Sequence, residues 1–236
     1  MNTQMTCLFC GNDVNSVKRA KKQCYICNQT EHTTELCSEG HFICKQCSST
    51  DSYDLIERFC LSTNEKDPVK LAKTIFMLPE IKMHGQEHHF IVPAVLLTSY
   101  FNTFPDENRK TEYLKAAKSR SQKMPAGKCG YMGTCGAAIG TGIFMSLIAC
   151  SNPTAGIEWQ LANLLTADTL KRIALVGGPR CCKRDSYIAI DESVKFLKQK
   201  FNKNLGSTTE ICCDFSYSNT DCLEDGCAFN KINKDL

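Results

Sequence analysis

The feature that most constrains this chain is a set of seven cysteines and one histidine in its first fifty residues, arranged as four closely spaced pairs. The pairs are Cys7/Cys10, Cys24/Cys27, Cys37/His41 and Cys44/Cys47. A spacer of two or three residues lets one tight turn present two ligands to one ion, and Zn²⁺ takes four thiolate or imidazole ligands in a tetrahedron. Eight ligands therefore predict two closed zinc sites. The sequence leaves open whether consecutive or alternate pairs share an ion.

The same region holds few large aliphatic side chains and shows no helical periodicity. Because so little apolar material does not fold alone, we expect bound metal to stabilise it. The order from Cys24 to Cys47 resembles the first part of a RING-type cross-brace, but the last cysteine pair of that family is missing and Cys7/Cys10 lies upstream. We therefore interpret residues 1–50 as a treble-clef or zinc-ribbon-like module that serves structure or docks a partner.

Other residues of this module carry weaker signals. We expect His32 in a loop, outside the ligand set. Four basic residues between the first two pairs could form a finger that contacts nucleic acid, although a solvated loop is the simpler interpretation. They are Lys18, Arg19, Lys21 and Lys22. The net charge of +3, from 28 Lys+Arg against 25 Asp+Glu, gives no further argument for nucleic acid or an anionic membrane as a partner.

Cysteine is unusually frequent, with 17 in 236 residues. The start, Met1–Met5, has neither the basic nor the apolar segment of a secretory signal. We therefore expect a cytoplasmic, reducing environment, in which closely spaced cysteines bind metal rather than form disulfides. The longest uncharged stretch lies between Lys128 and Glu158. Its continuous apolar part, 137–150, falls short of the ~18–20 residues of a membrane span, so we interpret it as a buried, Gly-rich helix.

From residue 51 onward the pattern becomes helical, so we predict a second, mainly α domain over residues 51–236. Apolar residues recur there at three- and four-residue intervals. Pro68 suits the first turn of a helix, and Asp106 suits an N-cap. Cys60 and Cys150 are expected in the core. The predicted helices span 54–60, 68–78, 88–104, 106–123, 136–150, 157–176 and 182–201, and an irregular tail follows over 207–236.

Three segments of this domain resemble, in the same order, the α-subunit of iron–sulfur L-serine dehydratases and the related cysteine desulfidases. Pro93-Ala94-Val95-Leu96 matches a Pro-Ala-Val-Leu segment of that family. Cys135, with Gly140, matches a Cys-x-Gly-x-x-Gly helix start. Cys181, Arg184 and Asp185 match a Pro-Cys-x-x-Arg-Asn segment, with Asp in place of Asn. The resemblance covers about residues 84–200 and implies a helical domain of the serine dehydratase α type.

The resemblance also implies a [4Fe–4S] cluster on three cysteines, with one iron left open for substrate oxygen. Cys135 and Cys181 would be two of its ligands. At the position of the third family cysteine this sequence has Lys171 and Arg172, and Ala138 replaces an acidic residue. Further ligands would come from the tail, where the candidates are Cys213, Cys222 and Cys227.

The chain as a whole resembles a Cys-rich family from anaerobic bacteria and archaea, the DUF5714 type. That family joins a domain of this kind to a Cys-rich N-terminal module. The resemblance implies an architecture and no particular reaction.

Several residues near these segments are candidates for catalysis. His88 and His89, together with His84, form a dense trio in which an imidazole could act as a base. Cys182 stands beside two basic residues, which would activate its thiolate. Arg180 and Arg184 both suit a carboxylate or phosphate, and Arg184 is the candidate anchor for an anion.

We therefore expect an iron–sulfur-dependent lyase or sulfur-handling enzyme that acts on a small anionic substrate, with two zinc ions in the N-terminal module. The alternative is a non-enzymatic zinc-binding adaptor or scaffold, which the missing third family cysteine favours. A protein partner would dock on the zinc module. Nucleic acid is a weaker candidate, and no membrane is expected.

Overall fold

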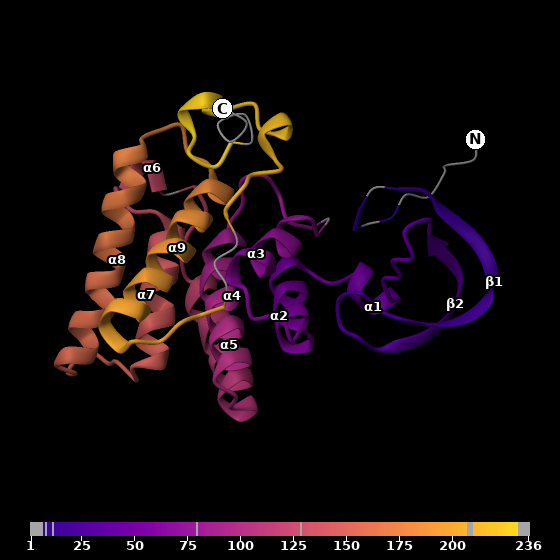
Figure 1. Cartoon of the computed structure of the whole chain (residues 1–236), viewed down its shortest axis with the longest axis horizontal. Coiled ribbons are helices and arrows are strands. Elements are labelled where there is room, and N and C mark those ends of the chain that lie inside the picture. Colours follow the sequence, from indigo (N-terminus) through magenta and orange to yellow (C-terminus); the bar gives the residue numbers. More distant parts are fainter. Residues whose placement is uncertain are drawn as a thin grey trace.

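The computed structural model describes residues 7, 9–10, 12–78, 80–127, 129–206 and 210–230. A small N-terminal module lies at one end of the molecule, and a helical body forms the rest (Figure 1). The remaining positions, among them Met1–Met5, Lys128 and parts of the 207–236 tail, lie outside the described residues. None of the described helices combines the length and the apolar character that crossing a bilayer requires.

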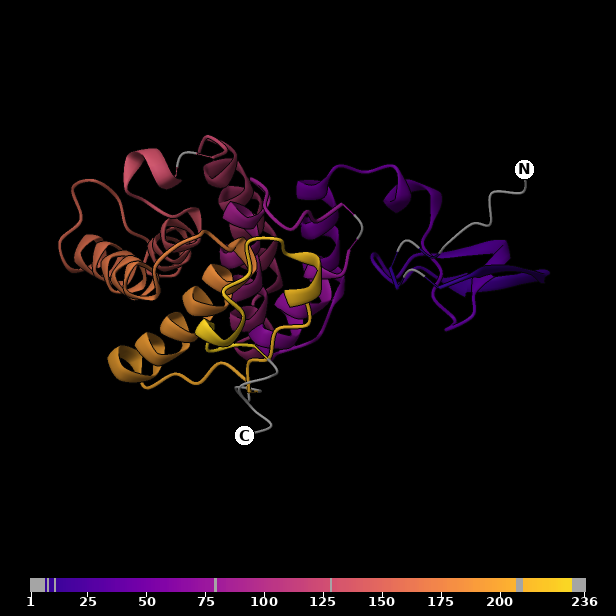
Figure 2. The ribbon, with the colours of Figure 1, turned by 90° about the horizontal axis from the view of Figure 1, so that it is seen from above.

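The N-terminal module is built on a hairpin of two antiparallel strands, β1 (Val14–Gln23) and β2 (Thr30–Cys37), which projects from the helical body (Figure 2). Val14 pairs with Cys37 at its base, and Ala20 pairs with Thr33. This hairpin corrects two predictions, because the basic residues 18–22 and His32 lie on strands rather than in loops. Neither strand has the apolar–polar alternation of a half-buried strand, so the sequence pattern did not reveal them.

The helical body contains the helices that periodicity predicts, with ends shifted by a few residues. Local caps explain the clearest boundaries: the Asp67 carboxylate accepts from the amides of Val69 and Lys70, and Asp106 accepts from Arg109. The described helices are α1 (Lys45–Ser48), α2 (Ser52–Ser62), α3 (Pro68–Phe76), α4 (His88–Thr103), α5 (Glu107–Gln122), α6 (Cys129–Met132), α7 (Gly136–Ile148), α8 (Ile157–Val176) and α9 (Cys182–Phe201).

Helix α4 is the centre of the body and is buried over most of its length. Helix α7 lies against it, and glycines allow the close approach. A Cβ on Gly140 would stand 2.9 Å from Pro93 Cδ on α4, and one on Gly142 would stand 2.2 Å from Thr166 Oγ1 on α8. This confirms that the glycines of α7 serve helix packing.

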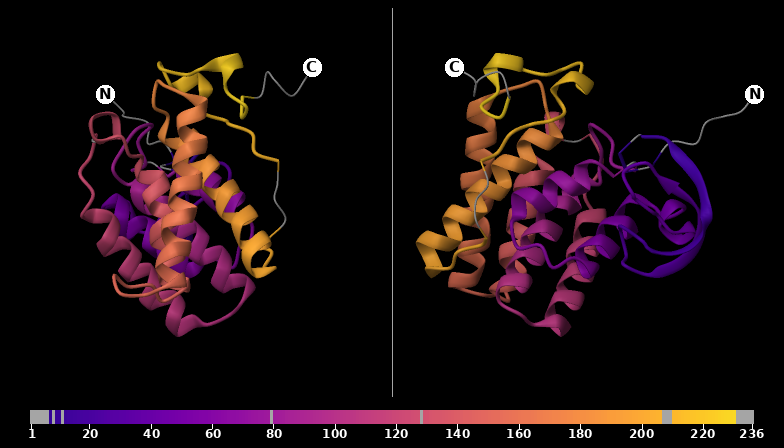
Figure 3. Two further views of the ribbon diagram at one scale, coloured as in Figure 1. Left: turned by 90° about the vertical axis from the view of Figure 1, so that its left-hand side faces the viewer. Right: turned by 45° about the vertical axis from the view of Figure 1, so that its right-hand side comes forward.

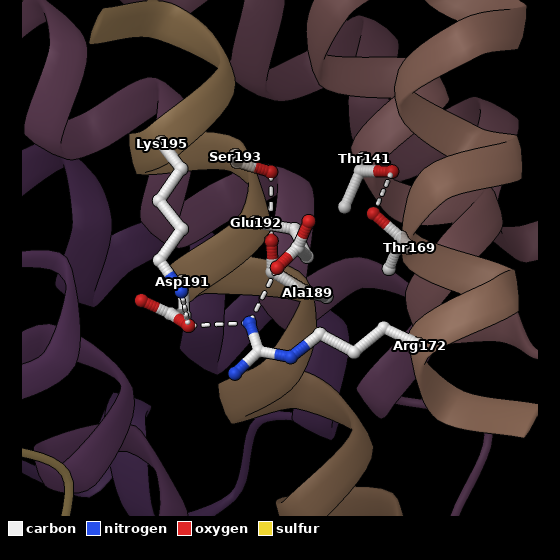
Figure 4. A network of polar contacts seen from close by, with 8 residues as sticks. All are labelled: Thr141, Thr169, Arg172, Ala189, Asp191, Glu192, Ser193 and Lys195. Carbon is white, nitrogen blue, oxygen red and sulfur yellow. Dashed lines mark hydrogen bonds and ion pairs between the residues drawn. The ribbon is translucent and has the colours of Figure 1, made fainter. Parts of the chain in front are cut away.

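Polar contacts join the outer helices α8 and α9 to each other and to α7. The Arg172 guanidinium on α8 pairs with Asp191 and Glu192 on α9, and Lys195 Nζ lies 2.8 Å from the Asp191 carboxylate (Figure 4). Thr141 and Thr169 place their hydroxyl oxygens 3.3 Å apart between α7 and α8.

The tail after α9 returns to the end of the body at which α9 begins (Figure 3). Two short 3₁₀ turns, Ser216–Ser218 and Glu224–Gly226, shape it. Phe215 packs edge-on against Phe76, and Phe229 packs against Tyr187, so aromatic contacts fix the tail on the helices. The tail cysteines are thereby brought to the start of α9.

The two cysteines expected in the core differ in their burial. Cys60 is fully buried on α2, as predicted. The prediction for Cys150 was wrong: the residue is exposed, because α7 ends at Ile148 and Cys150 adopts a left-handed conformation with φ of 55° in the following turn.

Candidate metal sites and a thiol cavity

The eight N-terminal ligands form two groups, and in each group the ligand atoms lie within 4.8 Å of one another. The first group joins the Cys7/Cys10 pair to the Cys37/His41 pair, and the second joins the Cys24/Cys27 pair to the Cys44/Cys47 pair. The pairing that the sequence left open is therefore interleaved, which is the order of a cross-brace. The groups are Cys7, Cys10, Cys37 and His41, and Cys24, Cys27, Cys44 and Cys47.

Distances within both groups suit one tetrahedral ion. Sulfurs about 2.3 Å from a zinc ion lie about 3.8 Å from each other. The Cys27 and Cys44 sulfurs are 3.8 Å apart, and Cys37 Sγ lies 3.8 Å from His41 Nδ1. Backbone amides point at the sulfurs as in metal-binding turns, with Cys47 N 3.4 Å from Cys44 Sγ. Both groups could hold a metal ion, and their donors are those that zinc prefers.

One candidate site of the helical body is a cavity of about 310 Å³, which we call the thiol cavity. It lies where α7 and α9 begin, so the amide ends of two helices face it. The chemically active side chains on its wall are Cys129, Cys135, Cys182, His84, His88, His89, Arg180 and Asp185.

Two thiols of this cavity, those of Cys135 and Cys182, have raised pKa values. Burial and the nearby Asp185 carboxylate raise the pKa of Cys135 to about 12, and the Cys135 sulfur lies 3.8 Å from that carboxylate. Burial likewise raises the pKa of Cys182 to about 11, although the Gly85 amide and Arg180 oppose this. Burial thus outweighs the basic neighbours that were expected to activate the Cys182 thiolate. A bound metal would supply the missing stabilisation of a thiolate.

Arg184 lies away from the thiol cavity. Its guanidinium donates to Asp185 Oδ1 at 3.0 Å and to the carbonyls of Gly177 and Pro179. The side chain is buried and fully occupied in closing the turn before α9. Arg180, which the sequence places four residues earlier, lines the cavity instead and is exposed.

The three histidines take different positions. The His89 ring covers Gly136 so closely that a Cβ there would stand 1.9 Å from His89 Cδ2. The His84 Nε2 donates to Asn219 Oδ1 of the tail at 3.1 Å. The Nδ1 atoms of His84 and His89 are buried and find no hydrogen-bond partner in the described part of the chain. The same holds for His88 Nδ1, so three imidazole nitrogens on the wall of the thiol cavity lack a hydrogen-bond partner among the described residues.

His88 is placed as a core residue, although it also touches the cavity wall. Its ring packs on Phe76, and Nε2 lies 3.1 Å from the Lys82 carbonyl oxygen. Burial lowers the pKa of His88 to about 3, so the imidazole stays neutral.

A second, smaller cavity lies between the start of α9 and the tail, and we call it the tail-cysteine cavity. Four cysteines line it: Cys181, Cys213, Cys222 and Cys227. The resemblance assigned Cys135 and Cys181 to one cluster, whereas here they line two different cavities. This grouping could not be predicted from the sequence, because about thirty residues of helix and loop separate Cys181 from the nearest tail cysteine in the cavity.

The family described as "Family of unknown function (DUF5714)" matches residues 56–230. The chain belongs to this family. The DUF5714 match contains both cavities and begins after the two N-terminal metal groups. No curated protein and no solved structure matches the chain.

Two members of the thiol cavity were not among the predicted site residues. Cys129 precedes α7 by seven residues, and Asp185 appeared only as a departure from a family motif. The signal that could have found Cys129 was its spacing, Cys-x5-Cys, in a loop that enters a helix.

Proposed function

We propose that this DUF5714 protein is an iron–sulfur-dependent lyase or sulfur-handling enzyme that acts on a small anionic substrate in the thiol cavity. The observation that carries the proposal is the composition of the wall around about 310 Å³: three thiols, an arginine, and three imidazoles whose Nδ1 atoms have no hydrogen-bond partner among the described residues. A cavity with convergent polar groups of this kind is the usual form of a small-molecule site. A scaffold has no need of it.

Each group has a separate task in such a reaction. Arg180 would bind the carboxylate or phosphate of the substrate, supported by the amide ends of α7 and α9. His89 or His84 would take a proton at Nδ1, because a bond made by the other nitrogen of each ring keeps Nδ1 unprotonated. The low pKa that burial gives His89 keeps it neutral and available as a base.

The donor set also fits an iron–sulfur cluster. Cys129, Cys135 and Cys182 could hold one on three thiolates, with Cys182 in the place that the resemblance gives to Cys181. A cluster on these residues would supply a Lewis acid for a leaving hydroxyl or thiol.

The N-terminal module is proposed to bind two zinc ions in a closed, structural manner and to dock a protein partner. Its two ligand groups leave no open coordination position. The module is tied to the helical body, since Ser62 Oγ donates to the Ile26 carbonyl at 2.6 Å and Asn28 Nδ2 donates to the Ser62 carbonyl at 2.7 Å.

The proposal is tested with the full chain, purified without oxygen and supplied with iron and sulfide. L-Serine and L-cysteine are offered, and the release of 2-oxo acid, ammonia and sulfide is measured. Arg180→Gln should raise KM, and His89→Gln should lower kcat by about 10²-fold or more, the ordinary contribution of a general base. Arg109→Gln, an exposed arginine on α5, is the matched control and should change neither constant.

Product release that needs iron and responds to these variants supports the proposal. Equal turnover by all variants would overturn the assignment of the cavity. A chain that binds two zinc ions, turns over neither compound and binds neither of them by calorimetry would instead support the zinc-binding adaptor or scaffold.

A further inference from the structure

We propose that Cys181, Cys213, Cys222 and Cys227 bind a second metal centre, a [4Fe–4S] cluster with a cysteine on every iron. The four thiols line the tail-cysteine cavity. They come from two distant segments, the N-cap of α9 and the tail, which Figure 3 shows meeting at one end of the body. Such a site is separate from the thiol cavity, and its test does not depend on the proposed reaction.

The spacing of the sulfurs argues against a single ion. In the described part of the chain, the only groups of three or more candidate ligands within 4.8 Å of one another are the two N-terminal ones. No three of the four tail-cavity sulfurs are therefore as close as a tetrahedral zinc site requires. In a four-iron cluster each thiolate binds a different corner of the cube, which keeps the sulfurs further apart.

Backbone amides are arranged to support thiolates at this cavity. The amides of Arg184, Phe215 and Glu224 point at the sulfurs of Cys181, Cys213 and Cys222, with nitrogen–sulfur distances of 3.4, 3.4 and 3.3 Å. Each amide follows its cysteine by two or three residues, as in the N-terminal groups. Hydrogen bonds of this type stabilise metal-bound thiolates and tune the potential of a cluster.

A buried cation lies near two of these sulfurs. Lys183 is almost inaccessible to solvent and interacts electrostatically with the thiols of Cys181 and Cys213 and with the Glu87 carboxylate, but it forms no salt bridge within the described part of the chain. Its Nζ lies 4.7 Å from the ring centre of Phe76 and 4.4 Å from that of Phe215, and 3.3 Å from the Phe76 carbonyl oxygen. A buried ammonium is costly unless an anion is near it. A cluster held by four thiolates carries net negative charge and would balance it.

The space now enclosed by this cavity is about 20 Å³, which is little more than one water molecule needs. Loading therefore moves the tail outward and separates the sulfurs further, and four thiol protons are released as the thiolates bind. The tail segment 210–230 should accordingly differ in hydrogen exchange between the iron-loaded and the iron-free chain.

The experiment compares iron, acid-labile sulfide and zinc per chain in the full-length protein prepared without oxygen. Cys222→Ser should lose about four iron and four sulfide while it keeps the zinc. Cys150→Ser, an exposed cysteine outside both cavities, is the matched control and should lose none. Cys135→Ser should leave the tail cluster in place, so failure of this site and failure of the thiol cavity are distinguishable.

Iron X-ray absorption of the wild-type chain and of Cys135→Ser gives a second measurement. Iron–iron scattering that persists in Cys135→Ser supports the cluster. The proposal is overturned by a third zinc that Cys222→Ser removes, or by iron and sulfide contents that Cys213→Ser and Cys222→Ser leave unchanged in folded protein.

Discussion

Cys181 and Cys182 are neighbours in the chain, yet their thiols line two different cavities. Cys181 is the N-cap of α9, with an extended backbone of φ −138° and ψ 105°, whereas Cys182 is the first residue of the helix. The change of backbone conformation between them turns the two side chains apart. The start of α9 is thus the wall between the thiol cavity and the tail-cysteine cavity.

The first prediction concerns the interleaved arrangement of the two N-terminal ligand groups. Cys7→Ser/Cys37→Ser changes two ligands of one group, so it should lose about one zinc per chain. Cys7→Ser/Cys24→Ser changes one ligand in each group and should lose about two. Zinc is counted by mass spectrometry of the purified chains. Consecutive pairing would reverse the two results, so either outcome decides the arrangement.

The helices could be predicted from the sequence because their signals are local. Asp67 and Asp106 cap the helices that follow them, and apolar periodicity marks the buried faces. The hairpin could not be predicted in the same way. Cys37 lies at its base and Cys24 at its turn end, in different ligand groups, so metal ligands rather than an apolar face hold it.

The candidate site was predictable in its residue types but not in its grouping. Metal-binding pairs are visible from spacing alone, whereas the meeting of Cys181 with Cys222 depends on how the tail folds back over α9. The exposure of Cys150 depended on a single turn, because α7 ends two residues before the apolar run does. Long-range packing and the exact ends of helices could not be predicted from the sequence pattern.

A second prediction concerns the contact between Gly136 and the His89 ring. Gly136→Ala would place a methyl group within the ring, so the imidazole must move. Overpacking of this kind should lower the free energy of unfolding by about 1–3 kcal/mol. Gly130→Ala, on the short helix α6 with nothing within 4 Å of its added Cβ, is the control and should be neutral or slightly stabilising. Urea unfolding measures both, and equal stability of the two variants would contradict the contact.

The buried imidazole of His88 predicts a dependence of stability on pH. Its folded pKa of about 3 lies below the ordinary value of 6.5, first because of burial and then because of the charges of Lys183, His84 and His89. Above pH 6.5 the residue is neutral in both states and has no effect. As pH falls below 6.5 the unfolded chain takes up a proton that the folded chain does not, so stability falls by up to about 1.4 kcal/mol per pH unit.

The measurement is urea unfolding of the wild type and His88→Gln between pH 7 and 4. Gln keeps a donor near the Lys82 carbonyl but does not titrate. As the pH falls, the wild type should therefore lose more unfolding free energy than His88→Gln does. A difference that stays constant over this range would show that His88 is accessible to protons in the folded state.

The last prediction concerns the ion pairs of Arg172 with Asp191 and Glu192 between α8 and α9 (Figure 4). The Arg172 side chain is 34% exposed, and the two carboxylates are 20% and 22% exposed, so solvent screens the pairs only in part. Arg172→Ala should lower the free energy of unfolding by about 1 kcal/mol, near the upper end for surface pairs. Lys171→Ala, its exposed neighbour on α8, is the matched control and should have little effect.

Added salt should reduce the difference between Arg172→Ala and the wild type, because ions screen charges that remain in contact with water. A double-mutant cycle with Asp191→Ala isolates the pair, and a coupling energy of zero would mean that packing alone joins the two helices.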